Sequence, residues 1–94
     1  MFILKRKLYE FRYITEARNL LDRHSKAQLL GKKIVEVRYL SQEEADDLGW
    51  EERCVVIHLD DGNIILPSSD DEGNSAGAMF TNDTKNPTLP VLRG

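Results

Sequence analysis

Two apolar runs joined by a short polar segment dominate the pattern of hydrophobic positions along this chain. Residues 54–59 and 64–67 carry apolar side chains at almost every position, and the polar residues 60–63 lie between them. Runs of this kind, bounded by turn-forming residues, are typical of strands that are covered on both faces. The sequence therefore predicts a buried β-hairpin over residues 54–67, and we expect the rest of the fold to form around it.

An alternating segment precedes the hairpin. Between residues 34 and 40, Val35, Val37 and Tyr39 occupy one face of an extended chain, and charged residues occupy the other. A period of two with one apolar face indicates a strand that is half buried. We expect the face of Val35, Val37 and Tyr39 to pack on the core.

A short helix is predicted directly after this strand. Ser41 and Glu44 have the spacing of a capping box, in which each side chain accepts a hydrogen bond from the backbone of the other residue. About two turns follow before Gly49, a residue type that commonly ends helices. Leu48 is expected to point inward and Trp50 to re-enter the core.

The N-terminal segment reads as a long helix. Residues 1–30 contain no Gly or Pro, and from Thr15 onward the apolar positions follow a helical period. Residues 2–13 fit either a helix or a strand, and we favour a helix that starts near Leu4 and could break near Thr15. One continuous helix of about 26 residues would be roughly 40 Å long, longer than the domain on which it must pack. Part of it would then need another partner, which favours a homodimer.

The segment after the hairpin is predicted to contain loops and short strands. An acidic loop over residues 68–74 is expected to be held by a small capping turn of Ser69 and Glu72. The chain should then rejoin the sheet at residues 78–81. Residues 88–92 predict a last strand, which its proline places at an edge of the sheet.

Together these elements predict an α+β fold in a single domain. A basic, mostly helical segment, residues 1–30, precedes a β-rich core, residues 31–94. The core is expected to be a five-stranded bent antiparallel sheet or a small open barrel with a short inserted helix, comparable in size to SH3-like or Sm-like barrels. This comparison concerns the fold alone and carries no function.

Charge is distributed unevenly along the chain. Residues 1–33 hold nine Lys/Arg and three Asp/Glu, a net charge of +6, whereas the remainder has a net charge of −9. The two halves could attract each other, within one chain or across a dimer, or the basic arm could bind nucleic acid. We favour mutual attraction. In the alternative, Tyr9 or Phe11 would stack on bases, and phosphates would be contacted by Lys5, Arg6, Lys7, Arg12 and Arg18.

No group of residues in the sequence amounts to a catalytic site. His58 alternates outward from its predicted strand and is interpreted as a surface imidazole, and Cys54 as a buried, inert thiol. Asp70, Glu72 and Asn74 match only the first positions of a calcium loop, so a small metal site there is a remote alternative. We therefore predict a protein that is not an enzyme and that holds no cofactor.

Signals for membrane insertion or secretion are weak in this sequence. No apolar run approaches the ~18 residues that a membrane span needs. The apolar residues 1–4 are followed, rather than preceded, by the basic residues 5–7, which is the reverse of a secretory signal. We expect a cytoplasmic protein that does not bind membranes.

Several short motifs are shared with a known group of proteins. They are Leu48-Gly49-Trp50, Leu59-Asp60-Asp61-Gly62 and, most specifically, Asp70-Asp71-Glu72-Gly73-Asn74 followed by Gly77-Ala78-Met79-Phe80. Over residues 30–92 the chain resembles a group of small, uncharacterised bacterial proteins. The resemblance implies a bacterial cytosolic protein of unknown function, and no activity can be carried over.

The functional hypothesis that follows is a non-enzymatic protein-interaction module that associates with itself. Its contrast of charge between the basic arm and the acidic loop points to a protein partner or a second copy. Nucleic-acid binding by the basic segment is the alternative. The residues expected to form the interaction loop are Asp70, Asp71, Glu72, Asn74 and Phe80.

Overall fold

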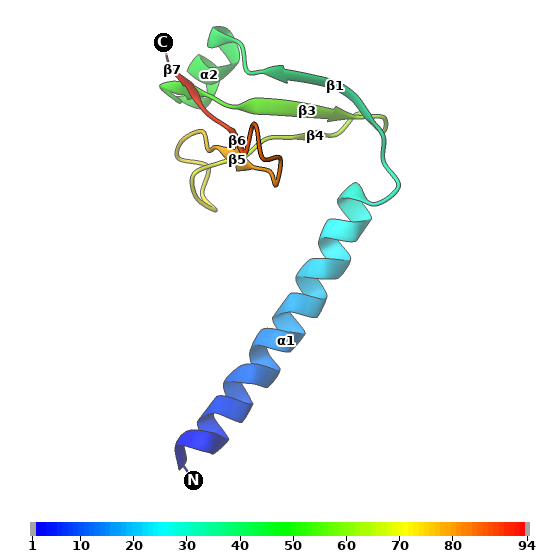
Figure 1. Ribbon diagram of the computed structural model, residues 1–94, viewed down its shortest axis with the longest axis vertical. Helices are drawn as coiled ribbons and strands as arrows, with labels where there is room; N and C mark the ends of the chain where they lie inside the picture. The colour runs from blue at the N-terminus through cyan, green and yellow to red at the C-terminus, as the bar shows by residue number, and fades with distance from the viewer. Residues whose placement is uncertain (1, 94) are drawn as a thin grey trace. The chain divides into compact units, whose positions relative to one another are not determined.

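The chain consists of two compact units, Met1–Lys32 and Lys33–Gly94. The computed structural model describes the backbone of residues 2–93 and the side chains of residues 15–93. The first unit is built on one long helix, α1 (Phe2–Leu29), drawn in blue and cyan in Figure 1. The second unit holds a short helix and all strands of the described chain.

Helix α1 runs without interruption over 28 residues. At its end the Leu30 N–H donates to the carbonyl of Lys26 at 2.9 Å, and Gly31 then takes a left-handed conformation with φ of 78°. The helix favoured for residues 2–13 is confirmed. The break near Thr15 is wrong, because no residue there lacks an N–H or resists helical geometry.

The second unit contains short elements. They are β1 (Ile34–Tyr39), α2 (Gln42–Leu48), β2 (Glu52–Arg53), β3 (Val55–Leu59), β4 (Ile64–Ile65), β5 (Met79–Phe80), β6 (Thr88–Leu89) and β7 (Leu92–Arg93). The strands form three separate antiparallel groups: a three-stranded sheet in the order β1-β3-β4, the pair β2-β7 and the pair β5-β6. Figure 1 shows strands β1, β3 and β4 side by side, with α2 at the same end of the unit as β7.

The three-stranded sheet is organised by the predicted hairpin. Gly62, with φ of 89°, lies in the turn between β3 and β4, and the Leu59 N–H donates across it to the carbonyl of Asn63 at 2.9 Å. On the other side of β3, Val37 lies opposite Ile57, and a bulge interrupts the register of β1 before this point. Strand β3 is therefore central, and β1 and β4 are the edges.

The core lies under one end of this sheet, where α2 packs. Its largest fully buried side chains are Cys54 and Val56, Ala45 of α2 is also fully buried, and Trp50 is 7% exposed. Helix α2 begins at the predicted capping box: the Glu44 N–H donates to Ser41 Oγ at 3.1 Å, and the Ser41 N–H donates to Glu44 Oε1 at 2.9 Å. The buried thiol, the capping box and the return of Trp50 to the core are thus confirmed.

The five-stranded sheet or open barrel is wrong in its detail, although the α+β class with antiparallel strands is confirmed. In the described chain no sheet closes, because the C-terminal strands pair in ladders of two residues outside the main sheet. The predicted strand over residues 88–92 is divided into β6 and β7. Residues 78–81 do not rejoin the hairpin, since Met79 pairs with Leu89.

Several residues predicted to be buried are exposed instead. Val35 and Val37 of β1 are 62% and 52% exposed, and Ile64 of β4 and Leu48 of α2 are each 50% exposed. Alternation identifies side chains that share a face, but only a neighbouring element can bury that face. The edges of this small sheet carry apolar side chains that no described element covers fully.

Candidate functional site

The acidic loop after β4 is arranged around the carboxylate of Asp70. One oxygen of this carboxylate accepts hydrogen bonds from the backbone N–H groups of Glu72 (3.0 Å) and Asn74 (3.2 Å). The other accepts from the side-chain amide of Asn74 at 2.8 Å. These bonds, first the one from the Asn74 side chain, hold the pKa of Asp70 below its usual range. Asp70 and Asn74 therefore shape the loop backbone.

A hydrogen bond from a core residue, Trp50, anchors the loop to the core. The indole N–H of Trp50 donates to the carbonyl of Gly73 at 2.8 Å, and the hydroxyls of Ser69 and Ser75 lie 2.7 Å apart. A Cβ atom on Gly77 would lie 2.7 Å from the carbonyl oxygen of Ser68, so this position has no space for a side chain. The capping turn predicted for Ser69 and Glu72 is thus formed instead by Asp70, which accepts from backbone N–H groups two and four residues ahead.

This arrangement bears on the metal alternative. Both oxygens of Asp70 already accept hydrogen bonds, and Asn74 also donates to Glu72 at 3.3 Å. Among the residues whose side chains are described, no three His, Cys, Asp or Glu side chains converge as metal ligands. A cation at this loop would have to displace the hydrogen bonds that hold it in shape.

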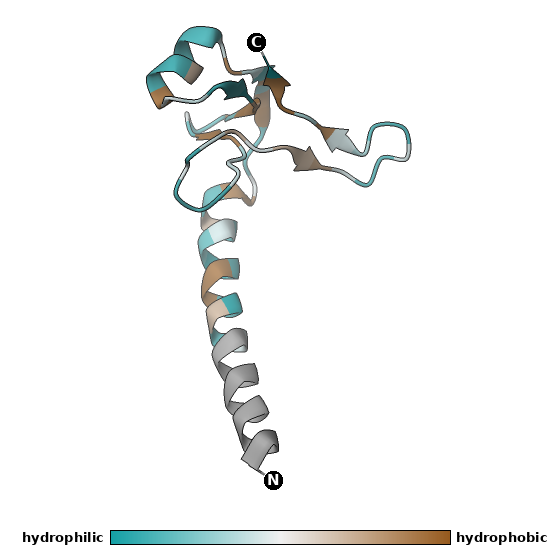
Figure 2. Cartoon of the chain, turned by 90° about the vertical axis from the view of Figure 1, so that its left-hand side faces the viewer, coloured by the Kyte–Doolittle hydropathy of each residue, from teal (hydrophilic) through white to brown (hydrophobic). Residues whose placement is uncertain are grey.

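All five members of the predicted interaction loop are exposed, and Asp71 and Phe80 are the two that do not shape the loop. Asp71 is exposed, and Phe80, at the end of β5, is 82% exposed. Phe80 lies where an arm made by β5, β6 and their connecting loop extends from the unit, and Figure 2 shows that this connecting loop is hydrophilic. The Thr81 N–H donates to the carbonyl of Pro87 at 2.8 Å and closes the arm. The exposed ring is therefore presented on an ordered base.

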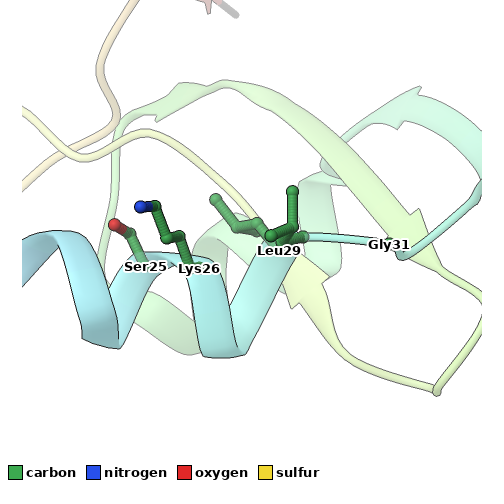
Figure 3. Close-up of a pocket in the computed structure, with 5 residues that line it drawn as sticks. Ser25, Lys26, Leu29 and Gly31 are labelled. Atoms are coloured by element: carbon green, nitrogen blue, oxygen red, sulfur yellow. The ribbon is translucent and has the colours of Figure 1, made fainter.

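The basic helix has a second exposed surface. From residue 18 to residue 30 every side chain is exposed, including Leu21 at 64% and Leu30 at 72%. An open hollow of about 340 Å³ lies at the end of α1, and Figure 3 shows that Lys26 and Leu29 project to the same side of the helix there. The helix thus carries apolar side chains among basic ones.

Of the five basic side chains predicted to contact phosphates, the structure describes one, Arg18. The side chain of Arg18 is 79% exposed and its Nε lies 3.8 Å from the carboxylate of Asp22, one turn further along α1. The side chains of Lys5, Arg6, Lys7 and Arg12 lie outside the described residues.

An ion pair that sequence reasoning missed joins β1 to α2. Arg38 Nη1 and Nη2 donate to the two carboxylate oxygens of Glu44 at 2.7 and 3.0 Å. This bidentate pair, together with the capping bonds from Ser41, lowers the pKa of Glu44 to about 2. The capping box was readable from local spacing, but the ion pair depends on where β1 ends relative to α2. It stabilises the start of α2 and has no reactive partner among the described residues.

His58 and Cys54 show no catalytic arrangement. His58 is half-buried in β3, and its Nε2 atom is buried without a hydrogen-bond partner in the described part of the chain. Cys54 is buried, and desolvation raises the pKa of its thiol, which disfavours the reactive thiolate. Glu36 lies opposite His58 in the register of β1 and β3, but its carboxylate accepts a hydrogen bond from the Val37 N–H at 2.9 Å.

Comparisons with known proteins add no assignment to this geometry. Of the described helices, none has the length and apolar character required to span a membrane. No protein-family model, no curated protein and no solved structure matches this chain.

Proposed function

We propose that this protein is a non-enzymatic interaction module that associates with itself through helix α1. The observation that carries the proposal is the exposure of leucines in this helix and directly after its end: Leu20, Leu21 and Leu29 of α1 and the following Leu30 are between 44% and 72% exposed. Fully burying one leucine side chain contributes about 1.5–3 kcal/mol. A partner that covered these four residues would therefore stabilise the helix strongly.

The described side chains of the first unit, from residue 15 onward, form no buried core, and this supports the proposed role. Among the described side chains of α1, residues 15–29, Ala17 is half-buried and the others are exposed. Helices in proteins owe most of their stability to packing of an apolar face, since the intrinsic preference for the helix is weak. A 28-residue helix with exposed leucines therefore suits a contact surface better than an isolated element.

The charges of the two units favour a second copy as the partner. The first unit, residues 1–32, has eight Lys/Arg and three Asp/Glu, a net charge of +5; the second, residues 33–94, has five and thirteen, a net charge of −8. Like charges oppose pairing of two α1 helices, whereas unlike units of two copies attract each other. Self-association that brings unlike units together is therefore the arrangement we propose.

Sedimentation of the full chain over a range of concentrations tests this proposal. We expect the mass to rise with concentration. We expect Leu21→Gln to reduce the association, because it removes an exposed apolar side chain but keeps a good helix former. Asn19→Gln is the control on the same helix and should leave the mass unchanged. A monomer at every concentration would overturn the proposal.

Phe80 and Asp71 form a second candidate contact for a protein partner. Their support is an exposed aromatic ring at the end of β5, together with an acidic loop that the Asp70 hydrogen bonds hold in shape. Aromatic side chains are the commonest anchors of protein interfaces. NMR spectra recorded during dilution identify the residues that enter the self-association contact. If the signals of Phe80 do not move while those of α1 do, this surface is free for another protein.

Nucleic-acid binding by α1 is the second candidate function. It is favoured by the net charge of +5 on the first unit and by the exposure of the Arg18 side chain, 79%. Titration with single-stranded RNA and with duplex DNA at low salt tests it, because phosphate contacts are strongest there. The absence of binding to either polymer would remove this candidate.

A further inference from the structure

Strand β1 leaves one row of backbone groups facing away from the sheet. The Leu40 N–H donates to the carbonyl of Cys54 at 2.9 Å, and Arg38 lies opposite Val56 in the same register. In an antiparallel pair the residues that exchange hydrogen bonds alternate with residues whose N–H and C=O groups point outward. The backbone groups of Val37 and Tyr39 therefore point to the free edge of β1, which has no neighbouring strand in the described chain.

Two side chains of the same strand occupy this edge. The outward N–H of Val37 donates to Oε1 of Glu36 at 2.9 Å, and Nη1 of Arg38 donates to the outward carbonyl of Tyr39 at 3.2 Å. Charged side chains on an edge strand oppose pairing with unrelated strands. The edge is nevertheless apolar in other respects, since Ile34 and Val35 are 61% and 62% exposed. Pairing along this edge therefore requires the Glu36 carboxylate to leave the Val37 N–H, while Arg38 can stay in place.

We propose that the β1 strands of two copies pair with each other, antiparallel and with Val37 of one copy opposite Val37 of the other. In this register Glu36 lies opposite Arg38 of the second copy, and Arg38 lies opposite Glu36 of the second copy. The two charges that cap the edge of the single chain become cross-strand ion pairs, and the outward N–H of each Val37 donates to the outward C=O of the other Val37.

The register follows from the order of charges along β1. A two-fold axis through Val37 exchanges the residues before and after it, and these carry opposite charges. Facing residues in the pairs without backbone hydrogen bonds have their side chains closest, at about 4.5–5.5 Å between Cβ atoms. Glu36 and Arg38 would form such pairs, because the outward hydrogen bonds belong to Val37.

The costs of this pairing are small. Arg38 has five N–H donors, so it can keep its bidentate bond to Glu44 and also donate to the carboxylate of Glu36 in a second copy. The second units repel each other through their net charge of −8. At about 0.15 M ionic strength this repulsion is screened over roughly 8 Å, whereas the ion pairs act at contact.

This inference goes beyond the proposed function, because the β1 edge is a contact separate from the leucines of α1. Val37→Pro tests it in the full chain. Proline removes the outward N–H and is tolerated at strand edges, and the Val37 N–H makes no bond to β3. We expect Val37→Pro to weaken association at least about tenfold, while Val37→Thr, which keeps the N–H, leaves it within about twofold.

Disulfide trapping tests the register directly. In the paired edges the Cα atoms of the two Val37 residues would lie about 5.5 Å apart, within the range of a disulfide. Under mild oxidation Val37→Cys should therefore form linked dimers. Val35→Cys is the control, because two such residues would lie several residues apart. The natural Cys54 is buried and does not compete.

A charge change separates the ion pairs from general repulsion. Glu36→Lys and the control Glu51→Lys reduce the negative charge equally, and both residues are exposed. We expect Glu36→Lys to weaken association about tenfold, because two cations would then face each other, and Glu51→Lys to leave it equal or stronger.

The outcomes separate the two proposals. If Val37→Pro associates as the natural chain does and Val37→Cys links no better than Val35→Cys, pairing of β1 is overturned. The role of α1 is then judged by Leu21→Gln alone. If Val37→Pro weakens association and Leu21→Gln does not, the β1 contact is supported and the role of α1 is overturned. A natural chain that stays monomeric overturns both.

Discussion

Truncation of Val56 to alanine is the most direct test of the core. Val56 is fully buried in β3, in the same cluster as Cys54 and Trp50. The change deletes two methyl groups, worth about 0.8 kcal/mol each in transfer from water. The cavity that remains adds to this cost, so we expect the free energy of unfolding to fall by about 2–3 kcal/mol.

Urea unfolding followed by tryptophan fluorescence measures this loss. Trp50 is the only tryptophan of the chain and packs in the same cluster, so its emission reports on the second unit. With a slope of about 1 kcal/mol per molar urea, a loss of this size should lower the midpoint by roughly 2–3 M. All samples need the same low protein concentration, because self-association would also shift the midpoint.

The matched control is Val35→Ala, which removes the same two methyl groups from a side chain that is 62% exposed. We expect its unfolding free energy to stay within about 0.5 kcal/mol of the natural value. If Val56→Ala were as mild as Val35→Ala, or if both were equally severe, the assignment of the core to the face of Val56 would be refuted.

Three further predictions concern the loop and the cap. Gly77→Ala should lower the unfolding free energy by about 1–3 kcal/mol, because its methyl group would lie 2.7 Å from the Ser68 carbonyl oxygen; a thermal melt that matches the natural chain would contradict this. Asp70→Ala should speed hydrogen exchange at the amide of Asn74, whereas Asp71→Ala should not, and equal rates would show that the carboxylate does not hold the loop. The pKa of Glu44 is lowered to about 2 from 4.5. Its contribution to stability is therefore complete above pH 4.5 and is lost as the pH falls towards 2; Glu44→Gln should flatten this part of the stability profile, and an unchanged profile would count against the ion pair.

Features set by neighbouring residues were predictable from the sequence. The capping box of Ser41 and Glu44 and the turn containing Gly62 each involve residues at most a few positions apart. Local spacing determines such hydrogen bonds, so they can be read without knowing the rest of the fold. The buried Cys54 was predictable for a related reason, since it begins the most apolar run of the chain.

The arrangement of the C-terminal strands was not predictable. The pairing of Arg53 with Leu92 joins residues far apart in the sequence through a ladder of two residues, which is too short to produce a periodic pattern. The predicted burial of Val37 failed for a different reason. Val37 belongs to an edge strand, and no described element covers its side chain fully.

The acidic loop illustrates how adjacent candidates compete. Residues 70–72 are all acidic, and each could in principle accept from nearby backbone N–H groups. Asp70 takes this role because its short side chain reaches the N–H groups of Glu72 and Asn74. The loop was found from the sequence, but the division between one structural carboxylate and its exposed neighbour Asp71 required the coordinates.

The bidentate bond between Arg38 and Glu44 closes a ring of backbone between the end of β1 and the first turn of α2. An insertion after Leu40 would move Arg38 away from Glu44 and would also shift the start of α2 relative to β1. The polar loop at residues 82–86, in contrast, could be lengthened without touching the core. Grafted peptides or labels should therefore be placed in the arm made by β5, β6 and their connecting loop. The junction of β1 with α2 should keep its natural length.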